Sequence, residues 1–82
     1  MPTIDTIDGI DINVYNGDHN PPHIHAVYNE YEVRINIKTC KQLLEGAMPN
    51  VQLRKIERWL GEEENRDTAL TVFKALNPGL RD

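Results

Sequence analysis

The sequence predicts an α+β fold, in which a small antiparallel sheet of three or four strands is followed by one bent helix or two helices packed on one face of the sheet. Three observations predict it. Apolar and polar residues alternate in the first half of the chain, and a two-residue reversal separates two of the alternating segments. After residue 49 the apolar period becomes that of a helix. A chain of 82 residues suits one domain, which we expect to span residues 1–82.

The first clear strand is the segment IDINVY. Its apolar side chains, Ile10, Ile12 and Val14, fall on one face, which is the pattern of a strand with one buried side. Asp8-Gly9 before it is a turn signal, preceded by an extended lead-in, and Asn-Gly followed by Pro-Pro ends it.

The next two strands, HIHAVY and YEVRINIK, are separated only by Asn29-Glu30. So short a connection predicts a tight hairpin, because Asn tolerates the left-handed conformation that such turns need. The resulting register sets His25 opposite Arg34 and leaves His23 on the same face, with the apolar residues on the other. We therefore expect a polar sheet face that the helices leave open.

The segment TCKQLLEG has two interpretations, of which we favour a short fourth strand over QLLE. The alternative is a helical turn that starts at Thr39. Beyond Pro49, one helical stripe is followed by a second, rotated stripe, with Asp67 predicted as the N-cap of a second helix. The stripes consist of Leu53, Ile56, Trp59 and Leu60, then Ala69, Leu70, Phe73 and Leu76. We expect Trp59 and both stripes to cover the apolar sheet face.

The composition narrows the class of protein. One cysteine, Cys40, excludes an internal disulfide and fits a reducing compartment. The sequence contains no apolar run long enough to span a membrane and no secretory signal, so we expect a cytoplasmic protein without membrane association. A net charge of −4 does not indicate a nucleic-acid binder, although residues 34–60 are locally basic.

The chemistry is concentrated in residues 18–26, DHNPPHIHA, which contain all three histidines. At strand spacing His23 and His25 point the same way, about 7 Å apart along the chain. His19 and Asp18 lie in the loop before them, which the two prolines stiffen.

Three hypotheses compete for this segment. In the first, His19, His23 and His25 bind a divalent metal such as zinc or manganese, with Asp18 as a further ligand or an orienting group. In the second, the two strand histidines act as acid and base on a phosphodiester without a metal, and Arg34 holds the phosphoryl oxygens. In the third, the histidines only form hydrogen bonds with the backbone of a stiff loop.

The strings GIDINVY, DHNPPHIHAVY and LLEGAMP, followed by a Trp-bearing helix, resemble the bacterial family called domain of unknown function 4160. The resemblance covers nearly the whole chain, apart from LGEEENRD after Trp59, which looks like an insertion. Its motif positions are Asp18, His19, Asn20, Pro21, Pro22, His23 and His25.

Members of that family resemble small partners in two-gene, toxin–antitoxin-like modules. The resemblance therefore implies an interaction component that binds a small protein encoded nearby. A small ribonuclease or metal-dependent phosphoesterase that uses the histidines is the alternative. An open sheet face and free edge strands also predict a homodimer as a second kind of association.

Overall fold

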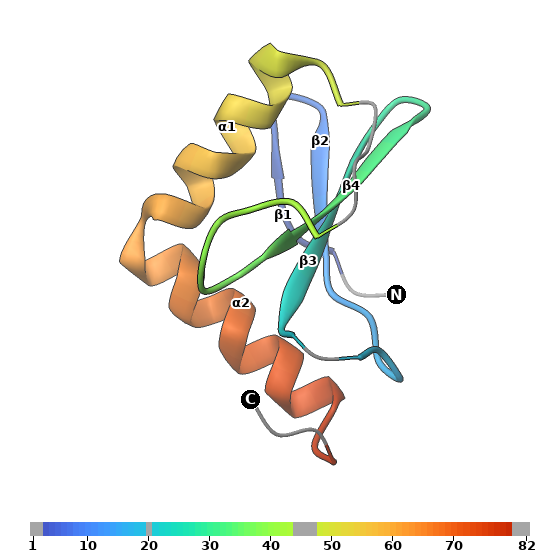
Figure 1. Cartoon of the computed structure of the whole chain (residues 1–82), viewed down its shortest axis with the longest axis vertical. Coiled ribbons are helices and arrows are strands. Elements are labelled where there is room, and N and C mark those ends of the chain that lie inside the picture. Colours follow the sequence, from blue (N-terminus) through green and yellow to red (C-terminus); the bar gives the residue numbers. More distant parts are fainter. Residues whose placement is uncertain (1–2, 20, 44–47, 80–82) are drawn as a thin grey trace.

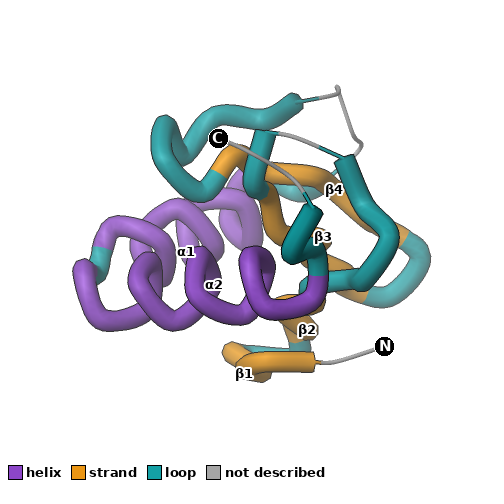
Figure 2. The backbone as a smooth tube through the Cα atoms, turned by 90° about the horizontal axis from the view of Figure 1, so that it is seen from below, coloured by secondary structure: helices purple, strands orange, loops and turns teal. Residues whose placement is uncertain are grey.

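The computed structural model describes residues 3–19, 21–43 and 48–79, and it confirms the α+β fold (Figure 1). Four strands precede two helices: β1 (Thr3–Ile7), β2 (Ile10–Asn13), β3 (His23–Tyr28), β4 (Tyr31–Asn36), α1 (Asn50–Gly61) and α2 (Glu63–Leu76). Seen from below, the helices lie side by side in one layer next to the strands (Figure 2). Neither helix combines the length and the apolar character that crossing a bilayer requires, as far as the chain is described.

The sheet is antiparallel throughout, with its strands in the order β1-β2-β3-β4. Ile7 pairs with Ile10, so the turn between β1 and β2 consists of Asp8 and Gly9, both with positive φ (47° and 80°). That combination suits a two-residue hairpin, whose twist matches that of the strands. The extended lead-in is therefore a strand in its own right, and it supplies the fourth strand of the sheet.

Where the strand QLLE was predicted, the described residues form an isolated bridge instead of a strand. Gln42 forms an isolated bridge with Ile35, and the Leu43 N–H donates to the Arg34 carbonyl at 3.0 Å. Leu44 and Glu45 lie outside the described residues. Residues 39–43 do not form the alternative helical turn.

The hairpin of β3 and β4 confirms the predicted register. Tyr28 pairs with Tyr31 and His25 with Arg34, and Asn29 has a positive φ of 53° in the turn between the strands. His23 pairs with Asn36 at the far end. Both histidines thus lie on the sheet face away from the apolar side chains.

The C-terminal half consists of two helices, which settles the choice between two helices and one bent helix. The chain is extended at Glu62 (φ −79°, ψ 124°), between α1 and α2. The prediction that Asp67 caps the second helix is wrong, because α2 begins at Glu63 and includes Asp67. Glu63 and Glu64 favour this earlier start, since acidic side chains in a first turn interact well with the helix dipole.

Side chains from both helices bury the apolar face of the sheet, as predicted. The core consists of Ile10, Ile12, Val14, Ile24, Ala26, Val33, Ile35, Ile37, Met48, Ile56, Trp59, Leu60, Ala69 and Phe73. Trp59 belongs to this core, and its Nε1 donates to Asp5 Oδ2 at 2.7 Å, so its polar atom is bonded. The predicted role of Trp59 is confirmed.

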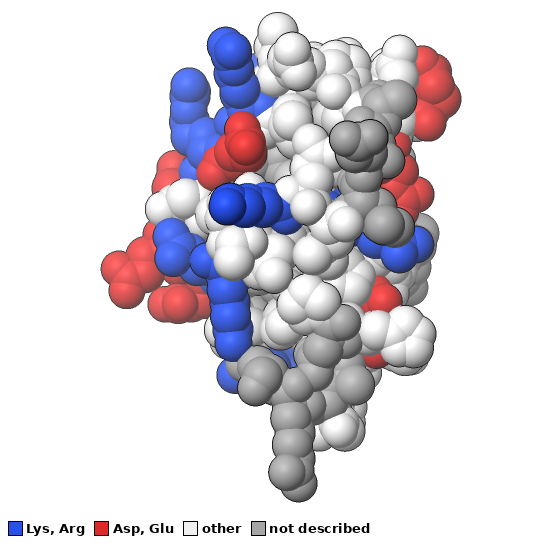
Figure 3. Space-filling model, viewed as in Figure 1, with Lys and Arg blue, Asp and Glu red and all other residues white. Residues whose placement is uncertain are grey.

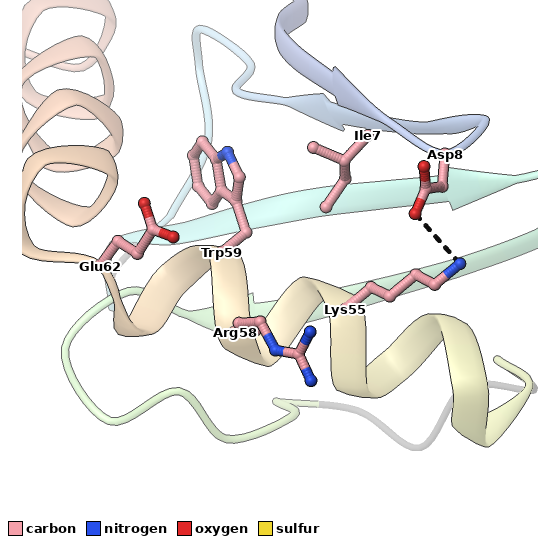
Figure 4. A pocket seen from close by; sticks show the side chains of 6 residues that line it. All are labelled: Ile7, Asp8, Lys55, Arg58, Trp59 and Glu62. Carbon is pink, nitrogen blue, oxygen red and sulfur yellow. Dashed lines mark ion pairs between the residues drawn. The ribbon is translucent and has the colours of Figure 1, made fainter.

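A pocket lies beside Trp59, between α1 and the β1–β2 turn (Figure 4). Its rim is fastened by an ion pair of Lys55 Nζ with Asp8 Oδ2 at 3.1 Å. The lining residues are Ile7, Asp8, Lys55, Arg58, Trp59 and Glu62. Both charge signs border the pocket, so it has no marked preference for an anion or a cation.

Charged side chains of both signs also mix on the face drawn in Figure 3. Lys and Arg gather over the helical half of that face, but Asp and Glu lie among them. The locally basic segment therefore does not form a uniformly basic surface there, which agrees with the net charge of −4.

Candidate metal centre

Three side chains converge where β3 begins. The Nε2 atoms of His23 and His25 lie 3.0 and 2.9 Å from the same oxygen, Oδ2 of Asp18. The residues come from two elements: both histidines stand on β3 two positions apart, and Asp18 lies in the preceding loop. One potential ligand atom from each residue lies within 4.8 Å of the other two. This Asp18–His23–His25 set is called the triad below.

His23 has an unusual hydrogen-bonding state. Its Nδ1 lies 2.7 Å from the Pro21 carbonyl oxygen. A carbonyl only accepts, so Nδ1 is the donor to it, and Nε2 is the ring nitrogen that faces the triad. The side chain is 4% exposed, and Nε2 has no hydrogen-bond partner among the described residues, because its short contact with Asp18 lacks hydrogen-bond alignment.

The second imidazole, His25, contacts a carboxylate at each ring nitrogen. Nε2 lies 2.9 Å from Asp18 Oδ2, and Nδ1 lies 3.0 Å from Glu32 Oε2. The ring of Tyr15 packs edge-on against it, with the ring centroids 4.3 Å apart. A carboxylate only accepts hydrogen bonds, so an Nδ1–H of His25 can donate to Glu32 while Nε2 faces Asp18.

The loop that carries Asp18 is fastened to the end of α2 by Asn77. The Asp18 N–H donates to Asn77 Oδ1 at 2.8 Å, and Asn77 Nδ2 donates to the carbonyls of Tyr15 and Phe73, both at 3.0 Å. Asn77 is buried, and its bonds join segments about sixty residues apart in the chain. The position of the triad carboxylate thus depends on the C-terminal helix.

The electrostatics of the triad favour an ionised Asp18. Burial raises the pKa of its carboxyl, but the hydrogen bonds from His25 and from the His19 backbone N–H, with the charges of both triad histidines, lower it by more. The net pKa lies below the ordinary value of 3.8. Asp18 is therefore negatively charged at neutral pH, beside a second carboxylate from Glu32.

This lowered pKa predicts an acid-dependent contribution to stability. A carboxyl whose pKa is lower in the folded state stabilises the fold above its unfolded pKa, and the contribution is lost as pH falls through the folded pKa. In metal-free protein we expect Asp18→Asn to lower the free energy of unfolding by about 2 kcal/mol at pH 7. The difference should shrink below pH 3.8. Urea denaturation of both proteins from pH 7 to pH 2.5 measures it, and a constant difference would contradict the assignment.

Comparison with protein families matches residues 9–70 to the family described as a domain of unknown function (DUF4160). The chain belongs to the DUF4160 family. No curated protein and no solved structure matches it. The matched segment contains the triad and Glu32, whereas Asn77 lies beyond it. Membership in DUF4160 supplies no biochemical role, so the partner protein and the two-gene module implied by the resemblance stay predictions.

Two other residues were predicted to take part in the site, and neither of them belongs to the triad. His19, also predicted as a metal ligand, is exposed and is not among the triad atoms. Arg34 is exposed, and no hydrogen bond or ion pair joins it to either triad histidine in the described part of this DUF4160 chain. The open polar face was expected to display the histidines, but they are buried, because Tyr15 and Asp18 fold over them and Phe73 packs 5.7 Å from the His23 ring.

Two residues of the site were not predicted. Glu32, rather than Arg34, contacts His25. It stands two positions from Arg34 on the same sheet face, so the register contained the signal that a diagonal neighbour was within reach. Asn77 carried no such signal, because its partners Asp18 and Tyr15 are distant in the sequence.

Proposed function

We propose that this protein binds one divalent transition-metal ion, with Asp18, His23 and His25 as its protein ligands. The observation that carries the proposal is the buried Nε2 of His23, which has no hydrogen-bond partner among the described residues and lies 3.0 Å from the oxygen that His25 also contacts. Leaving a buried polar atom unpaired costs about 1–3 kcal/mol. A metal ion among the three atoms removes that cost.

The dimensions of the triad support zinc. Tetrahedral zinc with bonds of about 2.0–2.2 Å holds its ligand atoms about 3.3 Å apart. The two nitrogen–oxygen contacts, at 3.0 and 2.9 Å, need to widen by only a few tenths of an ångström. Two imidazole nitrogens and a carboxylate oxygen also suit zinc better than magnesium or calcium.

The charges favour a cation over a phosphate. Asp18 and Glu32 both present carboxylates to His25, and the predicted phosphate-holding Arg34 makes no described contact with the imidazoles. Without a bound cation, an anion in the triad would be repelled by both carboxylates. Of the hypotheses drawn from the sequence, metal binding is therefore the better supported, with His19 outside the ligand set.

Metal titration of the purified chain tests the proposal. After chelator treatment and dialysis, we expect one zinc ion per chain by elemental analysis. We also expect a melting temperature about 10–20 °C higher at a free zinc concentration 100 times the dissociation constant. His19→Ala is the control and should bind zinc like the wild type. The assignment would be refuted if no zinc bound at a free zinc concentration 100 times a micromolar dissociation constant. It would also be refuted if binding depended on His19 and not on His25.

Hydrolysis of a phosphodiester is a second candidate function, favoured by the number of ligands. Three protein ligands leave the fourth tetrahedral position of zinc to a water molecule, and Asp18 retains 17% exposure. A bound ion would make that water a stronger nucleophile. Zinc-loaded protein should then cleave bis(p-nitrophenyl) phosphate faster than metal-free protein. Equal rates would remove hydrolysis and leave metal binding intact.

A further inference from the structure

The Nδ1 atoms of the two triad histidines, which face away from the triad, have different hydrogen-bond partners. His23 Nδ1 contacts a backbone carbonyl, that of Pro21, which no side-chain replacement at another position removes. His25 Nδ1 contacts the Glu32 carboxylate at 3.0 Å. Only the second imidazole therefore has a side chain as the partner of its Nδ1.

We propose that Glu32 is the positioning residue of the metal centre and sets its affinity without binding the ion. The inference rests on the proposed function. By accepting the proton of His25 Nδ1, Glu32 leaves the Nε2 lone pair free for the metal, which is the role that carboxylates commonly have beside metal-binding histidines. Its negative charge also makes the imidazole a stronger donor to a cation.

The identity of the neighbour decides the tautomer. Arg34 stands directly opposite His25 in the register, and a guanidinium only donates hydrogen bonds. If Arg34 had donated a hydrogen bond to Nδ1 of His25, the ring proton would lie on Nε2 and would block metal binding there. The carboxylate of Glu32 is the accepting group that occupies this place, from a position diagonal to His25 on the same sheet face.

Glu32 is suited to a clean test because its side chain is 50% exposed. Its replacement opens no buried cavity, so the metal-free fold should tolerate it. Glu30 provides a matched control: it lies in the adjacent turn, is exposed, and loses the same charge in Glu30→Gln. The pair separates the hydrogen bond to His25 from a general loss of negative charge.

The experiment measures zinc dissociation constants by competition with a chelator at pH 7.5. We expect Glu32→Ala and Glu32→Gln to weaken binding 10- to 100-fold, Glu32→Asp to recover part of the loss, and Glu30→Gln to stay within twofold of the wild type. Nitrogen-15 spectra of the zinc-loaded proteins should show a stronger hydrogen bond at His25 Nδ1–H in the wild type than in Glu32→Gln, a difference that a merely structural Glu32 would not produce.

The outcomes separate this inference from the proposed function. If the wild type binds one zinc ion and the Glu32 variants match Glu30→Gln, the positioning role is wrong and the metal centre stands. If the wild type binds no zinc, both are wrong. Circular dichroism of each metal-free variant establishes that it is folded. If Glu32→Ala does not fold, Glu32→Asp still tests the inference.

Discussion

Replacing His23 with Asn should weaken zinc binding at least ~100-fold while changing the free energy of unfolding of the metal-free protein by no more than about 1 kcal/mol. The first part follows from ligand number. Structural zinc sites with four ligands bind with about 10–16 kcal/mol, so each ligand supplies roughly 3 kcal/mol. A site with only three protein ligands therefore loses a large part of its binding free energy when one ligand is removed.

The second part follows from the state of the buried ring. The Asn side-chain nitrogen occupies nearly the place of His Nδ1 and can still donate to the Pro21 carbonyl. Removing the outer ring atoms leaves a small void beside Phe73, at a cost of about 1 kcal/mol. It also removes the unpaired Nε2, a gain of similar size.

Two measurements distinguish a metal ligand from a structural histidine. Chelator competition gives the zinc affinity, and urea denaturation in the presence of EDTA gives the stability of the metal-free fold. His19→Asn, at an exposed position of the same loop, should change neither quantity. A His23→Asn protein that loses several kcal/mol without metal and still binds zinc normally would show that His23 serves the fold alone.

The fold was largely predictable because its signals are local. Alternation fixes which side chains of a strand share a face, and a two-residue turn at Asn29 fixes the register, so the pairing of His25 with Arg34 followed from adjacent sequence. The start of the second helix was not predictable in the same way. Asp67 is a good capping residue, but the glutamates before it form an equally good first turn.

The sequence predicted which face of the strand carries the two triad histidines, but not that they are buried. The spacing of His23 and His25 placed both rings on one face, and the structure has them there. Their burial depends on the fold of the loop over them, through contacts of Tyr15 and Asp18 with the rings. No periodicity records such contacts, because loop conformation is set by tertiary partners as much as by its own residues.

Replacing Asn77 with Ala should lower the free energy of unfolding by about 2–3 kcal/mol and weaken zinc binding about tenfold. The side chain bonds the Asp18 N–H and the Tyr15 carbonyl, and Ala leaves both without that partner. Each loss costs about 1 kcal/mol or more. The affinity falls because the loop that carries the triad carboxylate is no longer held to α2, in the way that outer-shell partners orient metal ligands.

A second variant sharpens this prediction. Asn77→Asp keeps an acceptor for the Asp18 N–H but sets a carboxylate oxygen against the carbonyls of Tyr15 and Phe73, so it should be at least as destabilising as Ala. Thr71→Ala, at an exposed position of α2, should leave both stability and affinity nearly unchanged. Urea denaturation with EDTA and zinc competition measure the two effects. If both Asn77 variants lose stability and bind zinc as tightly as the wild type, Asn77 only fastens the helix, and the geometry of the triad does not depend on it.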